Sequence, residues 1–485
     1  MRLLWRVCCV RNTHDFLNMK QFIRSHLPES FIALYHLLLA VLANLWYRFP
    51  SRRLTVIGVT GTNGKTTVCN LIAHILSATG YKTGLTTTIN FKIGDRVWSN
   101  RTKQGMQGRF GLQRLLREMV SEGCTHAVVE TTSEGIKQYR HFGIRYSVAV
   151  FTNLTPEHIE SHGSFEKYRE AKGKLFSTLN ERGGSVVNGD DSAAEYFLKF
   201  KAGEKWVYKT QNSKLKTQNY GSELKILQIR EYHLSEQGSE FEAEFDGKKY
   251  VFTTKLLGLF NVYNSAAAIS AALSLGVQME VIQGAVSSFE PLPGRMEIIR
   301  NSIRNITIVV DYAHDPAALS AVYKTIRELH GNGEKPVLVA VLGACGGGRD
   351  KAKRPILGKL ASQHAKYVIF TNEDPYDDDP EEIMDQLEEG MKTDPSRAIN
   401  RNYWKILDRR EAIKKAVALS CDGGTIALTG KGCEEAMAVK DGLIMWDDRK
   451  VAREELLKLR ATNFTSSSPE APALAPQLAG VWKIV

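Results

Sequence analysis

A glycine-rich stretch near residue 60 has the residue types that bind phosphate. It reads Gly58-Val-Thr-Gly-Thr-Asn-Gly-Lys-Thr66, after an apolar run that starts at Leu54 and before apolar residues at helical spacing. Glycines let backbone N–H groups converge on phosphate oxygens, and the start of a helix adds partial positive charge. Lys65 would hold the terminal phosphates, and Thr66 would offer its hydroxyl to Mg²⁺. The pattern predicts a nucleotide-binding loop, although position 59 is valine and the strict GxxxxGK[ST] spacing is not kept.

Other polar residues follow runs that are typical of strands. These runs alternate with stretches of helical spacing, which predicts a parallel α/β sheet. Ligands bind such sheets at the carboxyl ends of the strands. Glu130 ends the run 125–130 and Asn153 ends the run 146–153. We therefore expect both side chains to lie near the phosphate loop.

A second α/β unit is expected after the break at Pro291-Leu-Pro-Gly-Arg295. Its strands cover residues 306–311, 336–343, 367–371 and 425–429. The expected organisation is an N-terminal extension with an apolar helix (1–50), a central domain (51–292), a C-terminal domain (293–462) and a tail (463–485). The tail is rich in Ser, Pro and Ala, a composition typical of disorder.

The composition of the 485 residues limits the partners. The excess of Lys and Arg over Asp and Glu is 64 − 53 = +11, which favours anionic ligands or a membrane surface. The chain has neither zinc-finger spacing nor a long basic run, so no nucleic acid partner is expected. Its seven cysteines are scattered without a CxxC pair, as in proteins of a reducing cytoplasm.

The stretch Phe31–Tyr47 is almost wholly apolar and is flanked by Arg24, Arg48, Arg52 and Arg53. Its 17 residues are at the short limit for a membrane span. We expect a helix that either packs on the protein or lies in a membrane interface, so the protein could also be membrane-associated.

Taken together, the motifs resemble those of the Mur ligases, ATP-dependent amide-forming enzymes of peptidoglycan synthesis, and most of all the MurE type. The resemblance covers residues 54–450. Besides the phosphate loop it rests on Asn153-Leu-Thr-Pro-Glu-His158, Ala171-Lys172, Asp311-Tyr-Ala-His314, Gly347-Gly-Arg-Asp-Lys-Ala-Lys-Arg-Pro355 and Gly430-Lys-Gly432. It implies a P-loop-type central ATPase domain with a parallel sheet, followed by a Rossmann-like C-terminal domain.

The resemblance also implies a reaction. The γ-phosphate of ATP would pass to a carboxylate of UDP-MurNAc-L-Ala-D-Glu, giving an acyl phosphate. The amine of meso-diaminopimelate or L-lysine would attack it, and phosphate would leave. Because such chemistry needs little covalent work from the protein, positioning and charge neutralisation would carry catalysis.

Site residues follow from the same resemblance. The catalytic residues would be Lys65, His158 and Lys172. The ATP-binding residues would be Gly61, Thr62, Asn63, Gly64, Lys65, Thr66, Thr67, Asn261, Arg295, Asp311 and His314. The Mg²⁺ ligands would be Thr66, Glu130, His158 and Lys172, the last as a CO₂-derived carbamate. The amino-acid substrate would contact Arg349, Asp374, Tyr376, Gly430 and Glu434.

Three departures from the family pattern concern the substrates. About 50 residues precede the phosphate-loop strand, so the usual N-terminal domain that holds UDP is expected to be lacking. Gly105-Met106-Gln107 replaces a Thr-Thr-Pro run that contacts the muramyl peptide. Glu373-Asp374-Pro375-Tyr376 replaces the Asp-Asn-Pro-Arg that selects meso-diaminopimelate. Because Tyr376 replaces that arginine and Glu434 could bind a distal ammonium, the sequence slightly favours lysine or another basic amine over meso-diaminopimelate.

Two other functions remain open at this point. One is a ligase similar to folylpolyglutamate synthetase, against which Arg349 and Gly430-Lys-Gly432 favour the MurE type. The other is a non-catalytic, membrane-anchored nucleotide-binding scaffold. The intact phosphate and metal positions oppose a scaffold, since a decaying site would lose some of them.

Overall fold

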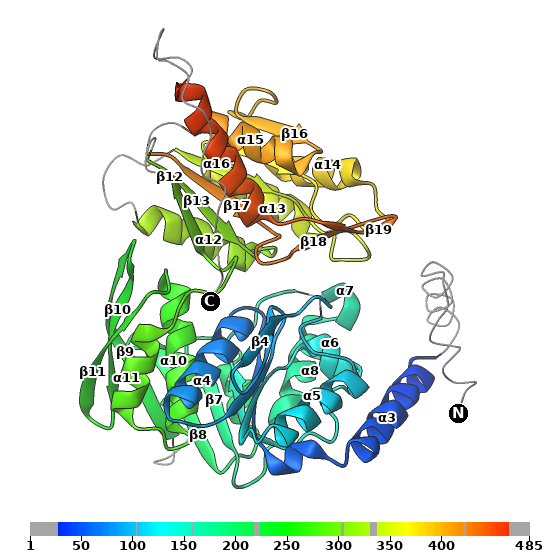
Figure 1. Ribbon diagram of the computed structural model, residues 1–485, viewed down its shortest axis with the longest axis vertical. Helices are drawn as coiled ribbons and strands as arrows, with labels where there is room; N and C mark the ends of the chain where they lie inside the picture. The colour runs from blue at the N-terminus through cyan, green and yellow to red at the C-terminus, as the bar shows by residue number, and fades with distance from the viewer. Residues whose placement is uncertain are drawn as a thin grey trace, which may run out of the picture.

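The computed structural model describes residues 28–102, 104–157, 159–217, 224–301, 305–329, 337–420 and 423–464. His158 and residues 465–485 of the expected disordered tail (463–485) lie outside the described residues, whereas residues 463 and 464 end the last described helix instead of belonging to a tail. The described chain forms two α/β halves, one above the other in Figure 1.

The first half is built on an 11-stranded sheet with the order β11-β10-β9-β8-β7-β6-β1-β5-β2-β3-β4. The strands from β9 to β2 in this order run parallel, and antiparallel strands border them on both sides. The strands are β1 (Thr55–Thr60), β2 (Thr83–Thr86), β3 (Asn90–Ile93), β4 (Arg96–Ser99), β5 (His126–Glu130), β6 (Tyr146–Phe151), β7 (Gly184–Asn188), β8 (Glu204–Thr210), β9 (Leu224–Ser235), β10 (Gly238–Phe245) and β11 (Lys248–Thr254).

Helices cover both faces of this sheet, which is why β1 is buried along nearly its whole length. On one face lie α4 (Lys65–Ala78), α10 (Leu259–Leu273) and α11 (Met279–Ser288). The other face packs against α5 (Arg109–Ser121), α6 (Ser133–Lys137), α8 (Phe165–Phe176) and α9 (Ala194–Leu198), and α7 (Ile159–His162) contacts α8.

The second half has a six-stranded sheet with the order β12-β13-β17-β14-β15-β16. Only the edge strand β12 is antiparallel to its neighbour. The strands are β12 (Glu297–Asn301), β13 (Ile306–Asp311), β14 (Leu338–Leu342), β15 (Tyr367–Thr371), β16 (Tyr403–Ile406) and β17 (Thr425–Thr429), followed by the hairpin β18 (Ala436–Val439) and β19 (Gly442–Met445). The helices are α12 (Pro316–Leu329), α13 (Lys353–His364) and α14 (Pro380–Met391) on one face, and α15 (Arg409–Leu419) and α16 (Asp448–Phe464) on the other. The expected α/β class is confirmed in both halves.

The segment that joins the two halves is fastened to the second one. A Cβ on Gly294 would lie 2.1 Å from the carbonyl carbon of Gly432, so the two backbones are in direct contact. Both glycines have positive φ, 59° and 49°, which side chains rarely adopt. Two residues later, Met296 N donates to Asp311 Oδ2 at 2.8 Å.

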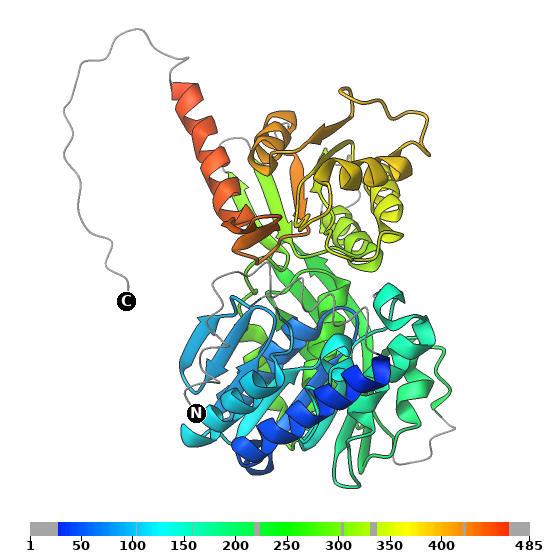
Figure 2. The same cartoon turned by 90° about the vertical axis from the view of Figure 1, so that its right-hand side faces the viewer.

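The apolar N-terminal stretch forms α3 (Glu29–Trp46), followed by a 3₁₀ turn, Pro50–Arg53. One side of α3 packs beside α5 on the outside of the first half (Figure 2). Asn44 fixes this contact: it is buried, its Nδ2 donates to Phe142 O at 2.9 Å, and it lies within 2.5 Å of where a Cβ of Gly143 would be. Among the described helices, none is long and apolar enough to cross a membrane.

Candidate active site

The predicted phosphate loop connects β1 to α4. Gly61 has φ 152° and Gly64 has φ 82°, and a Cβ on Gly61 would lie 1.9 Å from Thr152 Oγ1. Asn153, at the end of the adjacent strand β6, holds the loop: its carbonyl accepts from Thr62 N at 2.8 Å and its Oδ1 accepts from Asn63 N at 2.9 Å. The loop is therefore pre-formed, and the start of α4 faces the space above it.

Glu130 lies at the end of β5, beside the loop, as the sequence predicts. It is only 2% exposed, and its Oε2 accepts from Thr66 Oγ1 at 2.9 Å. Thr88 donates to the same carboxylate from both N and Oγ1, each at 2.9 Å. Hydroxyl and carboxylate oxygens are the hard donors that Mg²⁺ takes at nucleotide sites, so Thr66 and Glu130 fit this ion. Within the described part of the chain, no group of three His, Cys, Asp or Glu side chains could hold a metal.

Lys172 lies below the loop and is 2% exposed. Its Nζ donates to Gly61 O at 2.7 Å and lies 4.4 Å from the centre of the Tyr168 ring. Burial, reinforced by the charge of Lys65, lowers the pKa of Lys172 well below its usual value. The amine is therefore held toward the neutral form, which is the form that reacts with CO₂.

The second half places three predicted residues opposite the loop. Arg295 stacks on Tyr312, 4.6 Å from its ring centre. Asp311 ends β13 and accepts from the backbone N of Met296 and Ala313, each at 2.8 Å. Burial raises the pKa of Asp311, and Arg295 offsets part of that effect.

His314 makes a direct contact between the halves. Its Nε2 lies 3.2 Å from Oε1 of Glu157, and its Nδ1 contacts Tyr312 O at 2.9 Å. Burial, the largest single effect, would lower the pKa of His314, but the hydrogen bond to Glu157 together with the negative charges of Glu157 and Asp315 raises it overall. The pair therefore favours the arrangement in which the two halves face each other.

One cleft of about 520 Å³ brings most of these groups together, but Lys172 and Gly61 are not part of its lining. Its lining includes the loop residues from Thr62 to Thr67, Glu130, Asn261, Arg295, Asp311, His314 and Arg349. A larger hollow of about 830 Å³ adjoins it and shares Leu256, Leu292 and Arg295, but it contains no phosphate-loop residue. Of the two, the smaller cleft is the one in which the predicted phosphate-binding and metal-binding residues converge.

The residues expected to bind the amino acid are not all in this cleft. Arg349 lines it and shares a hydrogen bond with Tyr376, whereas Asp374, Tyr376, Gly430 and Glu434 lie outside its lining. Gly430 lies against Glu373, since a Cβ there would be 2.2 Å from Glu373 Oε2.

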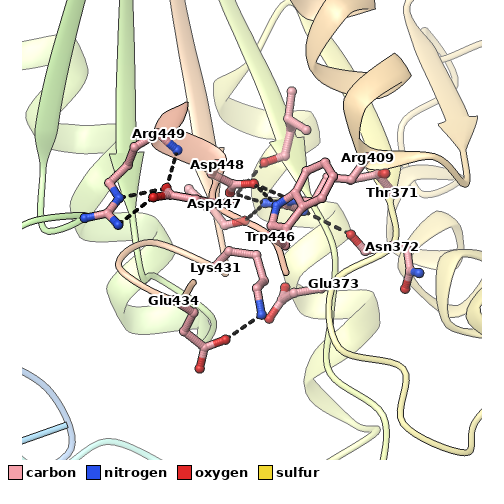
Figure 3. Close-up of polar contacts among 12 residues, drawn as sticks. Thr371, Asn372, Glu373, Arg409, Lys431, Glu434, Trp446, Asp447, Asp448 and Arg449 are labelled. Carbon is pink, nitrogen blue, oxygen red and sulfur yellow. Dashed lines mark hydrogen bonds and ion pairs between the residues drawn. The ribbon is translucent and has the colours of Figure 1, made fainter. Parts of the chain in front are cut away.

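Lys431 forms ion pairs with two of these residues, Asp374 and Glu434. Its Nζ donates to Asp374 Oδ1 at 2.9 Å, to Glu434 Oε2 at 2.5 Å and to Ala436 O at 2.7 Å, and Figure 3 shows it reaching Glu434. Lys431 thus links the loop after β15 to the loop after β17.

Arg409 fixes the strand ends from which these two loops begin (Figure 3). It donates to Asn372 O at 3.1 Å after β15 and to Thr429 O at 3.0 Å in β17. It also forms a bidentate ion pair with Asp448, at 2.8 and 2.6 Å, with both side chains at most 1% exposed. Arg409 therefore positions the loops without reaching the cleft.

Comparison with known proteins identifies the family. The description "Mur ligase middle domain" matches residues 59–272, and "Mur ligase, glutamate ligase domain" matches residues 294–432. The UDP-N-acetylmuramoyl-L-alanyl-D-glutamate–2,6-diaminopimelate ligase of Geobacillus kaustophilus is 37% identical over 423 residues, which are 86% of this chain and 81% of the relative. The chain belongs to the Mur ligase family. The ligase of the same name from Aquifex aeolicus is 35% identical over 85% of this chain and 80% of its own.

Solved structures agree with the fold of this Mur ligase. A 2,6-diaminopimelate ligase of the same name superposes with a TM-score of 0.55 and 31% identity, covering 84% of this chain and 79% of that one. Folylpolyglutamate synthase from Mycobacterium tuberculosis has a TM-score of 0.63 at 17% identity, over 86% and 96% of the two chains. At that identity the second likeness concerns the fold alone.

Two residues of the site were missed in the sequence of this Mur ligase. Thr88 follows β2 in a run of three threonines, and its place at a strand end could have indicated it. Glu157 lies in the quoted motif Asn153–His158, but only the orientation of the two halves gives it His314 as a partner. His158, predicted as a metal ligand, lies outside the described residues.

Proposed function

We propose that this Mur ligase couples ATP hydrolysis to the addition of meso-diaminopimelate to UDP-MurNAc-L-Ala-D-Glu. The observation that carries the proposal is the single cleft in which the phosphate loop and Glu130 face Arg295, Asp311, His314 and Arg349. Relatives that share more than a third of this sequence are named as ligases for these substrates. The product would be a precursor of peptidoglycan, and the proposed reaction class is an ADP-forming acid–amino-acid ligase.

The side chains divide the work as follows. Loop N–H groups and Lys65 hold the phosphates of ATP, with Asn261 and Asp311 toward the nucleoside and Arg295 and His314 closing from the second half. The dipeptide carboxylate takes the γ-phosphoryl group and becomes an acyl phosphate. The amine then attacks the carbonyl carbon, and phosphate leaves. Closure excludes water from this hydrolysable intermediate.

Thr66 and Glu130 would hold Mg²⁺, which neutralises charge on the phosphates when bound. Lys172 would carry a carbamate, formed when its neutral amine attacks CO₂ and releases a proton. A carbamate would replace the cation of Lys172 by an anion with oxygen donors beside the loop. These oxygens would add a metal ligand to Thr66 and Glu130, since the described residues contain no group of three His, Cys, Asp or Glu that could hold a metal. We also propose that His158 completes this set, as the family motif implies.

The choice of amino acid rests on the named relatives, which are 2,6-diaminopimelate ligases. Glu434 is paired with Lys431, but lysine and meso-diaminopimelate both carry a distal ammonium, so this pair does not separate the two. Arg349, at the cleft, would bind a carboxylate of the amino acid. Tyr376 stands where the motif has arginine, so we keep lysine as the alternative substrate.

We place the reaction in the cytoplasm. The described cysteines Cys69, Cys124, Cys345 and Cys433 are all free thiols, which suits a reducing compartment.

Phosphate release tests the proposal. Purified enzyme receives ATP, Mg²⁺ and UDP-MurNAc-L-Ala-D-Glu with meso-diaminopimelate, lysine or ornithine. We expect release that requires both the dipeptide and meso-diaminopimelate, loss of release in Lys65→Ala, and normal release in the matched control Lys174→Ala, an exposed lysine on α8. If lysine is the only one of the three amino acids that supports turnover, the substrate is lysine and not meso-diaminopimelate. If none of the three supports turnover, UDP-MurNAc-L-Ala-D-Glu is not the substrate that receives the amino acid.

A further inference from the structure

The outward side of α3 is apolar along its whole length. Seven side chains on it are each between 52% and 75% exposed: Phe31, Leu34, Tyr35, Leu38, Leu42, Leu45 and Trp46. At about 100° per residue, these positions fall within one arc of about 120°. The opposite side carries the small or polar residues Ala40, Ala43 and Asn44, which are buried against the protein.

This arrangement is the reverse of an ordinary surface helix, whose outward side is polar. A contiguous apolar surface of this kind marks a site of interaction. Specific contacts hold the opposite side of the helix on the protein, because Asn44 donates to Phe142 O and fits against Gly143. The apolar arc, defined here as the seven exposed residues of α3, is thus held outward by specific contacts.

Positive charge borders the apolar arc. From Ser30 to Leu54 the chain has no Asp or Glu. Arg48, Arg52 and Arg53 are exposed directly after α3. Arg145 is also exposed and lies near these arginines, because its backbone N donates to Ser51 Oγ at 3.2 Å.

This combination fits an anionic lipid surface. Apolar side chains enter the acyl boundary, arginines meet headgroup phosphates, and aromatic rings such as Tyr35 and Trp46 favour the interface. A second copy of the same face would instead bring the same arginines to the contact.

We propose that the apolar arc of α3 docks this enzyme on the surface of an anionic bilayer, with Arg48, Arg52 and Arg53 at the headgroups. The helix lies in the membrane plane, and its Asn44 side stays on the protein. No residue of α3 lines the active-site cleft, so docking leaves the cleft accessible.

Vesicle flotation of the full chain tests this docking. The lipids are phosphatidylcholine alone and phosphatidylcholine with phosphatidylglycerol. We expect binding to the anionic vesicles that weakens with salt. Leu38→Gln/Leu42→Gln should weaken it about tenfold or more, since two exposed leucines that would enter the acyl region are lost. Arg52→Gln/Arg53→Gln should weaken it about tenfold to thirtyfold.

Matched controls separate docking from general surface effects. Leu443→Gln/Leu457→Gln removes two leucines that are equally exposed in the second half, and Lys199→Gln/Lys201→Gln removes two exposed cations of the first half. Both should bind vesicles like the wild type. All four variants should keep the phosphate release measured without vesicles, so this test is independent of the proposed reaction.

Two results would overturn the docking. One is wild-type protein that does not float with anionic vesicles. The other is a dimer in light scattering that Leu38→Gln/Leu42→Gln converts to monomer while vesicle binding is unchanged. That result would assign the apolar arc to a second copy of the chain.

Discussion

Replacing Arg409 by methionine tests whether a buried ion pair holds the loops of the second half. The guanidinium makes two bonds to Asp448 and two to the carbonyls of Asn372 and Thr429. Methionine keeps most of the volume but none of these bonds. Asp448 would then keep Trp446 Nε1, at 2.8 Å, as its side-chain donor and would remain buried.

The size of the effect follows from this burial. Removing one partner of a buried pair leaves an uncompensated charge and costs about 3–5 kcal/mol. For a unit of about 150–250 residues, each kcal/mol lowers the melting temperature by about 2–4 °C, so we expect a fall of about 6–20 °C. The KM for the amino acid should rise as well, because the loops after β15 and β17 lose their common support.

The adjacent residue provides the control. Arg410 pairs with Glu454 and Glu455 at 2.7 and 3.0 Å, but its own side chain is 38% exposed, and the buried Glu455 also pairs with Lys458 at 2.7 Å. Each pair with an exposed partner contributes about 0–1 kcal/mol, so Arg410→Met should lower the melting temperature by no more than about 8 °C. Thermal unfolding followed by circular dichroism measures both. If Arg409→Met lowers the melting temperature no more than Arg410→Met does, burial does not set the energy of the Arg409–Asp448 pair and the reasoning is wrong.

Three further predictions concern the cleft. Glu130→Gln should lower kcat about a hundredfold or more, since a metal ligand is worth several kcal/mol of charge stabilisation; steady-state kinetics across Mg²⁺ concentrations measures it. We expect ¹³C-bicarbonate to give a carbamate signal in NMR spectra of the wild type, and Lys172→Arg should abolish it. The Glu157–His314 pair should weaken with pH: because the pKa of His314 is raised in the closed cleft, its contribution is complete below about pH 6.5 and is lost as pH rises through the raised pKa. The KM for ATP should therefore rise over that range in the wild type but not in Glu157→Gln.

Each of these has a result that would contradict it. Glu122→Gln, at an exposed site, should leave kcat unchanged, and an equal loss in both variants would remove Glu130 from the metal site. A carbamate signal that persists in Lys172→Arg belongs to another amine. A KM for ATP that follows the same pH course in Glu157→Gln would show that the pair does not act in closure.

The parts of the site that depend on neighbouring strands could be predicted from the sequence. Glu130 and Asn153 were placed beside the phosphate loop because β5 and β6 both pair with β1, and parallel strands bring their carboxyl ends together. Glu157 could not be given its partner, because His314 reaches it only through the relative orientation of the two halves.

Lys431 and α3 were harder for a similar reason. The sequence showed Glu434 and Asp374 as acidic residues near a substrate, and only the packing of two loops shows that Lys431 neutralises both. Periodicity left α3 apolar on nearly every side, so its buried side could not be chosen. Asn44 settles that choice, because a polar side chain on this helix found its acceptor on the protein.

The contact between Gly294 and Gly432 limits how this enzyme can be rebuilt. The joining segment is shaped to the loop that precedes Glu434, backbone against backbone. A chimaera that takes its second half from another ligase therefore needs its junction before Gly294, so that segment and loop come from one parent. A junction after Met296 would combine a joining segment and a loop from different parents, whose backbones need not be complementary. A side chain at Gly294 or Gly432 would clash with the facing backbone and prevent this contact.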